Sequence, residues 1–462
     1  MAEGKELKYH AIPERFIDRI RSKHPSNVVA SWLLSLEQLP EASVRLNIQK
    51  SKAVFEHAAP VLWCESGRHL GDRPLFAADP FYHGGVYYPQ ESSSMILAWV
   101  LEQLTFDTGT IDALDVAAAP GGKTLILSDF LRERGRVIAN EMDSRRCAIL
   151  EENVSRWGCD NVIVTHGTSA QLKNLYRQFQ IVLLDAPCSG EGMFRKDYHA
   201  RAQWNEELVA SCARLQNNIL NDISELVAPG GFLIYSTCTF SEEENIHQLD
   251  RLCESGEFEN VLLHPTGEWG IEVQSGGKAS VMQFIPGKVR GEGLTIGVLR
   301  RMGNDAKRSI KPENLYRALH STEHKQLPLD TGGMCYHEKR NHYVYSKFSV
   351  DELNKIQAAV FIRKSGITIG HLAGNAFIPD HEMAMASRFA GCYPSFQVDQ
   401  NLARRFLSGE TWSQDLSAGW YRIEYENVSL GWIKSLGNRF NNYMPKVLRL
   451  RSRELRNFIG DV

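Results

Sequence analysis

The sequence predicts an α/β protein built around a parallel sheet, with smaller domains before and after it. Between Pro89 and about Arg301, apolar strand-like runs alternate with helical segments, as in sheets whose strands are joined by crossover helices. A glycine-rich turn over residues 117–123 directly follows one of these runs. The length of 462 residues allows two to four domains, because single hydrophobic cores stop growing near ~250 to 300 residues.

The composition argues against membrane and disulfide elements. The longest apolar runs are far shorter than the ~20 residues of a transmembrane helix, and the N-terminus has no hydrophobic signal segment, so we expect a cytoplasmic protein. Nine cysteines without a Cys-x-x-Cys pair argue against a disulfide framework and a structural zinc site, and we expect no metal.

The charge is distributed unevenly along the chain. The formal net charge is -3, but residues 427–462 contain seven Lys or Arg against two acids. A basic segment with aromatic residues favours contact with nucleic acid, and a solvated charged helix is the alternative.

The N-terminal part is expected to form a small α/β domain. Phe16 and Ile20 lie four residues apart among charged residues, which predicts a short amphipathic helix over residues 13–24. Arg45 and Asn47 are candidates for contact with RNA, and an ordinary strand surface is the alternative interpretation.

Five strand-like runs define the expected central sheet. The runs are residues 113–116, 136–139, 161–165, 181–184 and 232–235. After the fourth run, a long helix is expected over about 204–227, ended by Pro229-Gly-Gly. Its apolar positions, at three-to-four spacing, are Leu208, Cys212, Leu215, Ile219, Ile223 and Leu226.

The last part of the chain is less regular. Residues 281–285 and 294–299 flank turn residues and predict an antiparallel hairpin that closes the sheet edge. Residues 303–309 resemble a polar linker, 311–379 give no clear pattern, and short β-like runs return in 419–433. The expected domains are 1–88 for RNA positioning, 89–302 for catalysis, 303–383 as linker and intermediate domain, and 384–462 as a β-rich module.

The glycine-rich turn indicates a cofactor site. Gly121 and Gly122 remove side chains where backbone amides must approach a ligand, and Asp115 lies near the end of the preceding run. Glu141 follows Gly121 by 20 residues, a spacing that puts a carboxylate within reach of a ribose diol. The alternative is an ordinary tight turn between a strand and a helix.

The same turn favours S-adenosylmethionine over a nucleotide phosphate. The turn lacks the G-x-G-x-x-G spacing that seats a pyrophosphate on a helix N-terminus, and S-adenosylmethionine has no phosphate to seat. Lys123 follows two glycines as in a P-loop, but Ala117 stands where the P-loop motif requires glycine, so nucleotide hydrolysis is disfavoured.

Two cysteines follow strand-like runs. Cys188 and Cys238 are therefore expected at the carboxyl edge of the sheet, where open α/β sheets bind ligands. Carbon 5 of cytosine accepts a methyl group only after a nucleophile has added to carbon 6, and a thiolate suits that addition. The other seven cysteines fit the commoner interpretation of small buried apolar residues. The pattern favours cysteine-dependent methyl transfer to a pyrimidine.

Other groups are expected to support this chemistry. Lys123 and backbone amides at the sheet edge are candidates for lowering the pKa of the attacking thiol. Asp185, if it is protonated or shares a proton, would offset the charge that develops at ring nitrogen 3. A second cysteine could help to remove the proton from carbon 5, directly or through water.

Three segments resemble the motifs of the RNA cytosine-5 methyltransferases of the Sun-domain family. They are DVAAAPGGKT at 115–124, DAPCSGEGMFRKD at 185–197 and STCTFSEEEN at 236–245. The extension at 190–197 resembles the bacterial RsmF-like branch, which acts on 16S ribosomal RNA, and GWIK at 431–434 and NNYMPK at 441–446 resemble its PUA-like ending. This similarity spans nearly the whole chain. It implies a Rossmann-like S-adenosylmethionine-dependent methyltransferase with a small N-terminal α/β domain and a C-terminal PUA-like β-rich module.

The resemblance also implies residue roles. Cys238 would be the nucleophile, and Cys188 would assist proton removal and release of the product. Gln90, in a segment that resembles the family's helix entry, would lie near the target base. Relatives commonly carry an aspartate near the adenine where this chain has Thr168, whose hydroxyl can still bind the amino group. The implied cofactor contacts are Ala117, Ala118, Ala119, Pro120, Gly121, Gly122, Lys123, Glu141, Thr168 and Asp185.

The expected substrate is a cytidine of 16S ribosomal RNA, within the 30S subunit, and the enzyme is expected to act as a monomer. The alternatives are methylation of transfer RNA and a ribosome-assembly factor that binds RNA without turnover. Retention of both cysteines argues against the assembly factor. The C-terminal candidates for RNA contact are Lys434, Arg439, Lys446, Arg449, Arg451 and Arg453.

Overall fold

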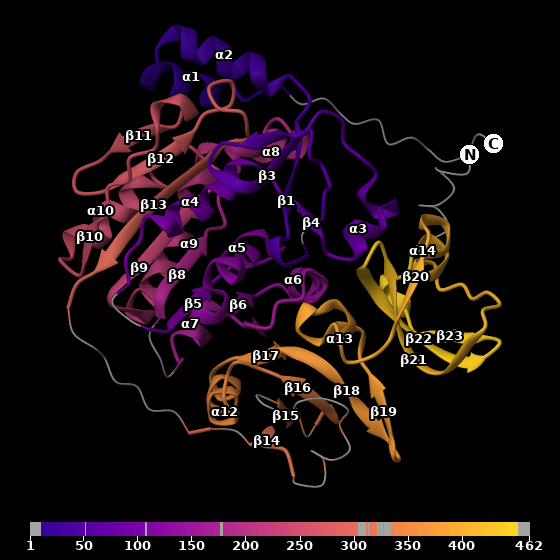
Figure 1. Cartoon of the computed structure of the whole chain (residues 1–462). Coiled ribbons are helices and arrows are strands. Elements are labelled where there is room, and N and C mark those ends of the chain that lie inside the picture. Colours follow the sequence, from indigo (N-terminus) through magenta and orange to yellow (C-terminus); the bar gives the residue numbers. More distant parts are fainter. Residues whose placement is uncertain are drawn as a thin grey trace.

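The computed structural model contains four β-sheets within the residues that it describes (Figure 1). The largest has ten strands, and smaller sheets precede and follow it along the chain. None of the described helices is both long and apolar enough to cross a membrane. The described residues are 11–50, 52–106, 109–175, 179–303, 311–312, 314–320, 323, 327, 334–337 and 339–450.

The central sheet has a parallel core, as predicted. Neighbouring strands pair parallel in the order β9-β8-β5-β6-β7. Each of the five predicted runs lies within one of these strands or overlaps it, so the carboxyl ends meet at one edge. The strands are β5 (Ile111–Asp115), β6 (Gly135–Glu141), β7 (Val162–His166), β8 (Phe179–Asp185) and β9 (Val227–Thr237).

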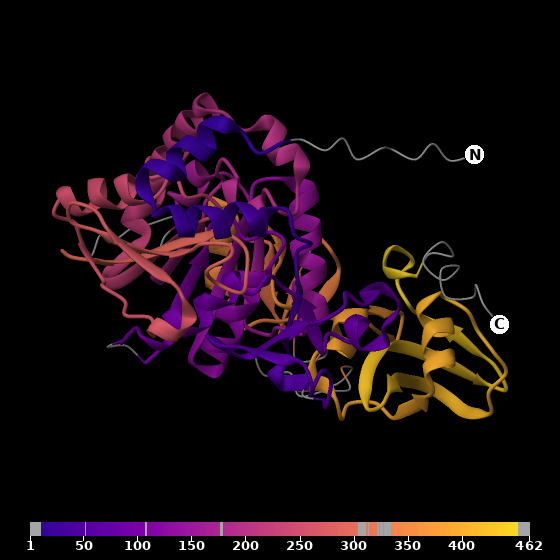
Figure 2. The ribbon, with the colours of Figure 1, turned by 90° about the horizontal axis from the view of Figure 1, so that it is seen from above.

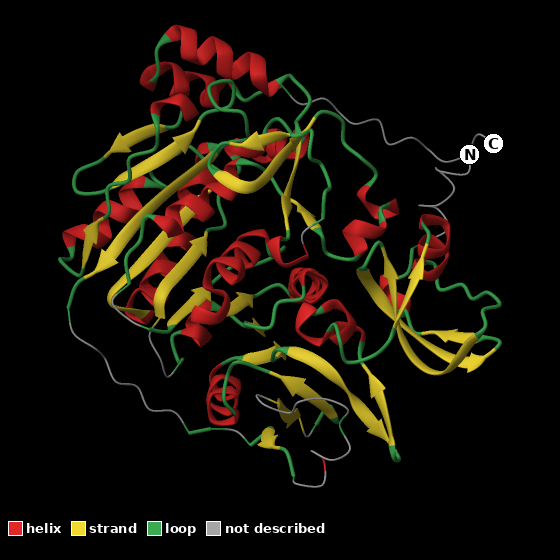
Figure 3. Cartoon of the chain, in the orientation of Figure 1, coloured by secondary structure: helices red, strands yellow, loops and turns green. Residues whose placement is uncertain are grey.

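Helices cover both faces of this sheet (Figure 3). Adjacent residues of a strand point to opposite faces, so Ala113 packs in one apolar cluster and Leu114 in the other. Burial on both sides explains why the strands read as continuous apolar runs. One face carries α4 (Ile96–Glu102), α5 (Gly122–Leu131) and α6 (Ser144–Trp157), and the other α7 (Ser169–Leu172), α9 (Glu206–Ile223) and α10 (Ile246–Glu254).

The predicted hairpin is confirmed. Strands β12 (Ser280–Phe284) and β13 (Leu294–Arg301) pair antiparallel, and β13 adds to β9. The sheet does not end there, because β11 (Glu272–Ser275) pairs with β12, and β10 (Phe258–Asn260) pairs with β13.

The long predicted helix is present, but it ends earlier than expected. Helix α9 stops at Ile223, and β9 already begins at Val227, so the Pro229-Gly-Gly segment lies inside a strand. Gly230 has φ +72°, which lets the strand bend there. The buried face of α9 includes Gln216, whereas Leu215, assigned to the apolar stripe, is 46% exposed.

The N-terminal part begins with two helices, α1 (Glu14–Lys23) and α2 (Ser26–Leu36). Phe16 and Ile20 are the buried residues of α1, which confirms the predicted amphipathic helix. An antiparallel sheet of order β2-β3-β1-β4 follows. Its strands are β1 (Ala42–Leu46), β2 (Ala59–Val61), β3 (Cys64–Leu70) and β4 (Tyr87–Pro89), and α3 (Pro80–His83) precedes β4.

The region that gave no clear pattern forms a sheet of order β14-β15-β16-β18-β19. Strand β17 (Phe361–Lys364) pairs antiparallel with β7 and so joins the central sheet instead. Apart from Gly303, the predicted linker lies outside the described residues. The other elements are β14 (Tyr316–Ala318), β15 (Met334–His337), β16 (His342–Tyr345), α12 (Val350–Ala359), β18 (Ile367–Ala373), β19 (Ala376–Pro379) and α13 (His381–Met385).

The last sheet confirms the predicted β-rich module. It has the order β20-β21-β22-β23 and stands to one side of the central sheet in two views (yellow in Figures 1 and 2). Its elements are β20 (Ser395–Val398), α14 (Gln400–Leu407), β21 (Leu416–Tyr425), β22 (Val428–Gly437) and β23 (Phe440–Asn442).

Candidate active site

The predicted catalytic and cofactor residues gather at the carboxyl edge of the parallel strands. The glycine-rich turn joins β5 to α5, Glu141 ends β6, Asp185 ends β8, and Cys238 directly follows β9. Residues far apart in the chain meet there because parallel strands all end at the same edge. The structure thus brings together the groups that the sequence placed on separate segments.

The glycine-rich turn has the backbone that only glycine adopts easily. Gly121 has φ +118° and directly precedes α5. A Cβ atom on Gly122 would lie 3.1 Å from the Gln90 amide nitrogen and 3.2 Å from the Tyr88 ring. The turn therefore keeps its open backbone by excluding side chains.

Hydrogen bonds from two neighbouring elements fix the turn. The Ala118 N–H donates to the Asn140 carbonyl at 2.8 Å, and the Asn140 amide donates to the Val116 carbonyl at 3.0 Å. Arg146 and Asn153 of α6 donate to the carbonyls of Ala119 and Pro120. The backbone that would face a cofactor is held in place before any ligand arrives.

Glu141 presents a carboxylate oxygen without a hydrogen-bond partner. The residue is buried, and its Oε1 accepts the Asp143 N–H at 2.9 Å. Its Oε2 receives no hydrogen bond from the described residues, although the Arg146 guanidinium lies 3.5 Å away. A buried acceptor that lacks a donor suits a ligand hydroxyl, so this site fits the ribose diol of S-adenosylmethionine.

Asp115 is a second buried carboxyl beside the turn. Its Oδ2 accepts the Thr124 hydroxyl at 2.6 Å, and its Oδ1 has no hydrogen-bond partner among the described residues. Burial, with the nearby Asp185 carboxylate as a smaller cause, raises the pKa of Asp115 to about 7. This group therefore changes charge near neutral pH.

We expect Asp115→Asn to stabilise the protein more at high pH than at low pH. The folded-state pKa of Asp115 lies above its usual value of 3.8, so its contribution to stability falls as pH rises from about 4 to 7. Asparagine does not ionise, so it removes this pH-dependent contribution, and its side-chain oxygen can still accept the Thr124 hydroxyl. Its gain in free energy of unfolding should be about 2 kcal/mol larger at pH 8.5 than at pH 5.5. Denaturant unfolding at both pH values measures it, and an equal effect at both would contradict the assignment.

The two predicted cysteines are in contact. Their Sγ atoms are 2.9 Å apart, and the Cys238 N–H points to the Cys188 sulfur at 3.3 Å. Both side chains are partly exposed. The hydrogen bond with Cys238, followed by burial, raises the pKa of Cys188 well above its usual value. The Cys188 thiol is therefore harder to ionise than an ordinary cysteine.

Asp185 and Lys123 form an ion pair beside these thiols. Lys123 Nζ lies 2.7 Å from Asp185 Oδ2, and the Ser236 hydroxyl donates to Asp185 Oδ1 at 2.7 Å. The Asp185 carboxylate is thus held by a lysine and a serine at the carboxyl edge of the sheet.

Two buried glutamates behind the thiols were not singled out in the sequence. Glu191 accepts hydrogen bonds from the Phe240 N–H and the Trp204 indole, at 2.8 and 3.1 Å. Glu244 accepts the Ser189 N–H and the Gln216 amide, each at 2.9 Å. Each carboxylate bridges the segments that follow β8 and β9, and burial raises the pKa of both. Their positions within the two cysteine motifs, 185–197 and 236–245, were the only sequence feature that could have pointed to them.

Thr168 is already engaged in the structure. Its hydroxyl accepts the Gln171 N–H at 3.3 Å and caps the N-terminus of α7. The Thr168 N–H in turn donates to Gln171 Oε1 at 2.9 Å, which completes a capping box. The hydroxyl therefore has a structural role irrespective of any contact with adenine.

Two candidates for RNA contact are buried. Arg45 is 2% exposed and donates to Gln90 Oε1 and Asp129 Oδ2, and Asn47 donates to the Gly85 and Trp157 carbonyls. Both side chains join the N-terminal sheet to the central domain. Gln90 is also buried, but it lies against Gly122, beside the cofactor turn.

The C-terminal candidates differ in exposure. Arg439 and Lys446 are exposed. Lys434 lies over the Trp420 ring at 5.4 Å, and Arg449 donates to the Met444 carbonyl at 3.1 Å. Arg451 and Arg453 lie outside the described residues.

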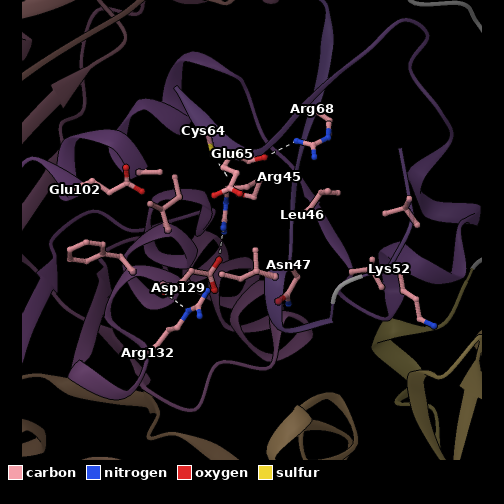
Figure 4. A pocket seen from close by; sticks show the side chains of 17 residues that line it. Arg45, Leu46, Asn47, Lys52, Cys64, Glu65, Arg68, Glu102, Asp129 and Arg132 are labelled. Atoms are coloured by element: carbon pink, nitrogen blue, oxygen red, sulfur yellow. Dashed lines mark hydrogen bonds and ion pairs between the residues drawn. The ribbon is translucent and has the colours of Figure 1, made fainter. Parts of the chain in front are cut away.

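A cavity of about 420 Å³ lies away from this edge, between the N-terminal sheet and α4 and α5 (Figure 4). Arg45, Asn47 and Asp129 are among its 17 lining residues. None of the predicted catalytic or cofactor residues lines it. This hollow is thus separate from the site that the sequence indicates.

Comparisons with protein families agree with the geometry. Residues 103–300 match the model described as 16S rRNA methyltransferase RsmB/F. Residues 12–92 match the N-terminal domain of 16S rRNA methyltransferase RsmF, and residues 393–450 match the methyltransferase RsmF PUA domain.

Curated relatives extend over most of the chain. A ribosomal RNA small subunit methyltransferase F from Shewanella loihica is 28% identical over 94% of this chain and 95% of its own length. One from Aliivibrio fischeri is 26% identical over 95% and 97%. Another, from Pectobacterium atrosepticum, is 35% identical over 51% of each chain.

Solved structures share the fold. NSun6 from Pyrococcus horikoshii, solved with SFG, has a TM-score of 0.54 at 19% identity, over 64% of this chain and 100% of that chain. A methyltransferase homolog protein from the same organism has a TM-score of 0.51 at 24% identity, over 63% and 100%. At these identities the likeness shows the fold alone.

Proposed function

Because the chain belongs to the family of 16S rRNA methyltransferases RsmB/F, we propose that it methylates carbon 5 of a cytidine in small-subunit ribosomal RNA. The observation that carries this proposal is the pair of thiols 2.9 Å apart beside the glycine-rich turn. A methyltransferase whose target atom is already nucleophilic, such as a nitrogen, needs no such pair of thiols. Carbon 5 of cytosine becomes nucleophilic enough only after a covalent bond forms at carbon 6.

The cofactor site is assigned to the glycine-rich turn and Glu141. The backbone from Ala117 to Lys123 binds and orients S-adenosylmethionine, and the free oxygen of Glu141 accepts the ribose hydroxyls. The bound cofactor supplies the methyl group as an electrophile. Asp185 lies at the same edge and holds Lys123 in place through their ion pair.

The thiols act in sequence. The Cys238 thiolate adds to carbon 6 of the cytosine, and the electron pair of the 5,6 double bond becomes available at carbon 5. Once carbon 5 carries the methyl group, its proton must leave. Loss of that proton restores the double bond and expels the Cys238 sulfur. Cys188, in contact with Cys238, accepts the proton directly or through water, after it has released its own proton to water.

Lys123 and Asp185 stabilise the base during the attack. Addition at carbon 6 places negative charge on the ring toward nitrogen 3, and a group that shares a proton there offsets it. Lys123 carries such a proton, and Asp185 fixes its position at 2.7 Å. The pair thus takes the role that the sequence suggested for an Asp185 that is protonated or shares a proton.

The RNA is proposed to reach this edge in the 30S subunit, with one copy of the enzyme per particle. Chemistry on a base requires that the base leave its stack, which costs a few kcal/mol. Contacts of the exposed Arg439 and Lys446 with phosphates would recover part of that cost.

Methyl transfer tests the proposal directly. Purified enzyme and tritiated S-adenosylmethionine are incubated with 30S subunits, with free 16S RNA and with bulk transfer RNA. We expect label in the small-subunit RNA, located on 5-methylcytidine after digestion. Label only in transfer RNA would reassign the substrate, and no label in any RNA would leave a binding factor.

Glu141→Gln should weaken cofactor binding about 10- to 100-fold, because a hydrogen bond to a charged group contributes about 1.5 to 3 kcal/mol. Glutamine can keep the bond to the Asp143 N–H while it places a donor where the free oxygen now lies. Calorimetric titration with S-adenosylmethionine measures the change. Glu152→Gln, on the exposed side of α6, is the matched control and should bind as the wild type does. Equal affinities of the two variants would remove Glu141 from the site.

A further inference from the structure

A second cavity lies beside the active edge. It has a volume of about 260 Å³, and its lining includes Arg73, Phe76, Gln90 and Lys196. Gln90 also contacts Gly122, so one side chain borders both the cavity and the cofactor turn. Lys196 belongs to the segment that follows Cys188, only eight residues further along the chain. The cavity is therefore next to the proposed site of methyl transfer.

A chain of contacts links the cavity wall to the thiols. Glu91, which lines the cavity, accepts the Glu292 N–H at 2.8 Å. The next residue, Gly293, packs closely on Gly192. A Cβ atom on Gly192 would lie only 2.5 Å from the Gly293 carbonyl oxygen. Gly192 in turn donates its N–H to the Cys238 carbonyl at 2.8 Å. These contacts connect the cavity wall to the backbone of Cys238.

The acids around this cavity are already occupied. Glu41 forms two hydrogen bonds with Arg290. Glu91 accepts three N–H bonds and one hydroxyl, which spreads its charge over four donors. Burial favours the neutral form of Glu91, but Lys196, in the same lining, favours the ionised form and, with the N–H bonds, holds the pKa of this buried carboxyl below its usual value.

Two cations in the lining retain capacity for an anion. Arg73 is exposed, and within the described part of the chain its one recorded partner is the Phe76 ring, 6.0 Å away. Lys196 lies 3.6 Å from Glu292, but Arg195 already forms a bidentate bond with that carboxylate. Arg73 and Lys196 are the two exposed charged side chains of the lining, and exposed cations of this kind can bind a phosphate group.

An aromatic ring completes the lining. Phe76 is partly exposed, and it packs on Tyr87 with a centroid distance of 5.9 Å. A supported, partly open ring beside cations is the arrangement on which nucleic acid bases stack, because every base has a π face. The volume of about 260 Å³ has room for one base.

We propose that this cavity is a subsite for one nucleotide of the RNA strand, next to the target cytidine. Phe76 stacks with its base, and Arg73 and Lys196 bind its phosphate. The inference rests on the proposed function for the identity of the strand. It extends that function, since it assigns a contact with a neighbouring nucleotide to residues outside the catalytic and cofactor groups.

The test measures binding of a fluorescent single-stranded RNA that contains one cytidine, at several salt concentrations, to wild type, Arg73→Ala, Lys196→Ala and Phe76→Ala. The two cation variants should bind about tenfold more weakly, and each should lower the slope of log affinity against log salt by about one. Phe76→Ala should bind about tenfold more weakly with an unchanged slope. Arg68→Ala, which alters the cavity of Figure 4, is the matched control and should bind as the wild type does.

Abasic nucleotides test the stacking partner. Two RNAs are compared, one abasic at the nucleotide 5′ to the cytidine and one abasic at the nucleotide 3′ to it. One of the two should bind wild type more weakly than intact RNA, and with that RNA Phe76→Ala should cause no further loss of affinity. Additive losses on both sides would overturn the stacking assignment. If Phe76→Ala fails to fold, the exposed Arg73 and Lys196 variants still decide the phosphate contact.

The outcome separates this inference from the proposed function. Wild-type affinity in all three variants, with methyl transfer intact in the wild type, would overturn the subsite and leave the function standing. Weak RNA binding by the variants, with no methyl transfer by the wild type to any RNA, would overturn the function and retain the subsite.

Discussion

Cys238→Ala is expected to abolish methyl transfer, with a loss of more than about 10³-fold in turnover. Without the thiolate, no nucleophile adds to carbon 6, and carbon 5 stays too poor in electrons to accept the methyl group. Alanine should leave the surrounding structure intact, because Cys238 is partly exposed and the Cys188 side chain can occupy the space. Incorporation of tritiated methyl into small-subunit RNA measures the loss.

Cys212→Ala is the matched control for this variant. Cys212 is also a partly exposed free thiol, on α9, and nothing assigns it to the reaction. It should retain turnover within about twofold, since surface substitutions usually change stability by less than ~0.5 kcal/mol. Turnover of Cys238→Ala within tenfold of the wild type would instead move the nucleophile to Cys188.

Cys188→Ala is expected to accumulate a covalent complex between the enzyme and RNA. Cys188 keeps its proton mainly because of its hydrogen bond with Cys238, 2.9 Å away. When the Cys238 sulfur bonds to carbon 6, that hydrogen bond weakens and the pKa of Cys188 falls, so Cys188 can release its own proton to water and then accept the carbon 5 proton as a thiolate. Alanine removes this acceptor after the adduct has formed.

Denaturing gels that separate free RNA from protein-bound RNA measure the adduct. It should appear with Cys188→Ala in the presence of S-adenosylmethionine and be absent in the double variant Cys188→Ala/Cys238→Ala. The wild type should show only a trace, because release is fast. An adduct that formed with Cys238→Ala instead would exchange the roles of the two thiols. Normal turnover of Cys188→Ala without any adduct would give proton removal to another group.

Local patterns determined the central fold and the composition of the site. Strands β5 to β9 are buried on both faces, and their sequences are therefore nearly continuous apolar runs. Gly121 indicates a turn whose backbone has a positive φ. Since parallel strands end at one edge, these local facts suffice to place Glu141, Asp185 and Cys238 together. The distance between the two sulfurs, however, depends on side chains from two loops and could not be read from spacing.

Long-range contacts decided the rest. In the sequence, Arg45 looks like a solvent-facing residue of a strand. In the structure, helix α5 packs over Arg45 and supplies Asp129, 84 residues later in the chain, as its hydrogen-bond partner. Strand β17 joins β7 across about 200 residues, which no local periodicity records. Sequence by itself determined which segments become strands and where the reactive groups leave them. Only the tertiary structure decided which strand and helix surfaces are buried. A charged side chain such as Arg45 can be buried only where a residue distant in sequence supplies its hydrogen-bond partner.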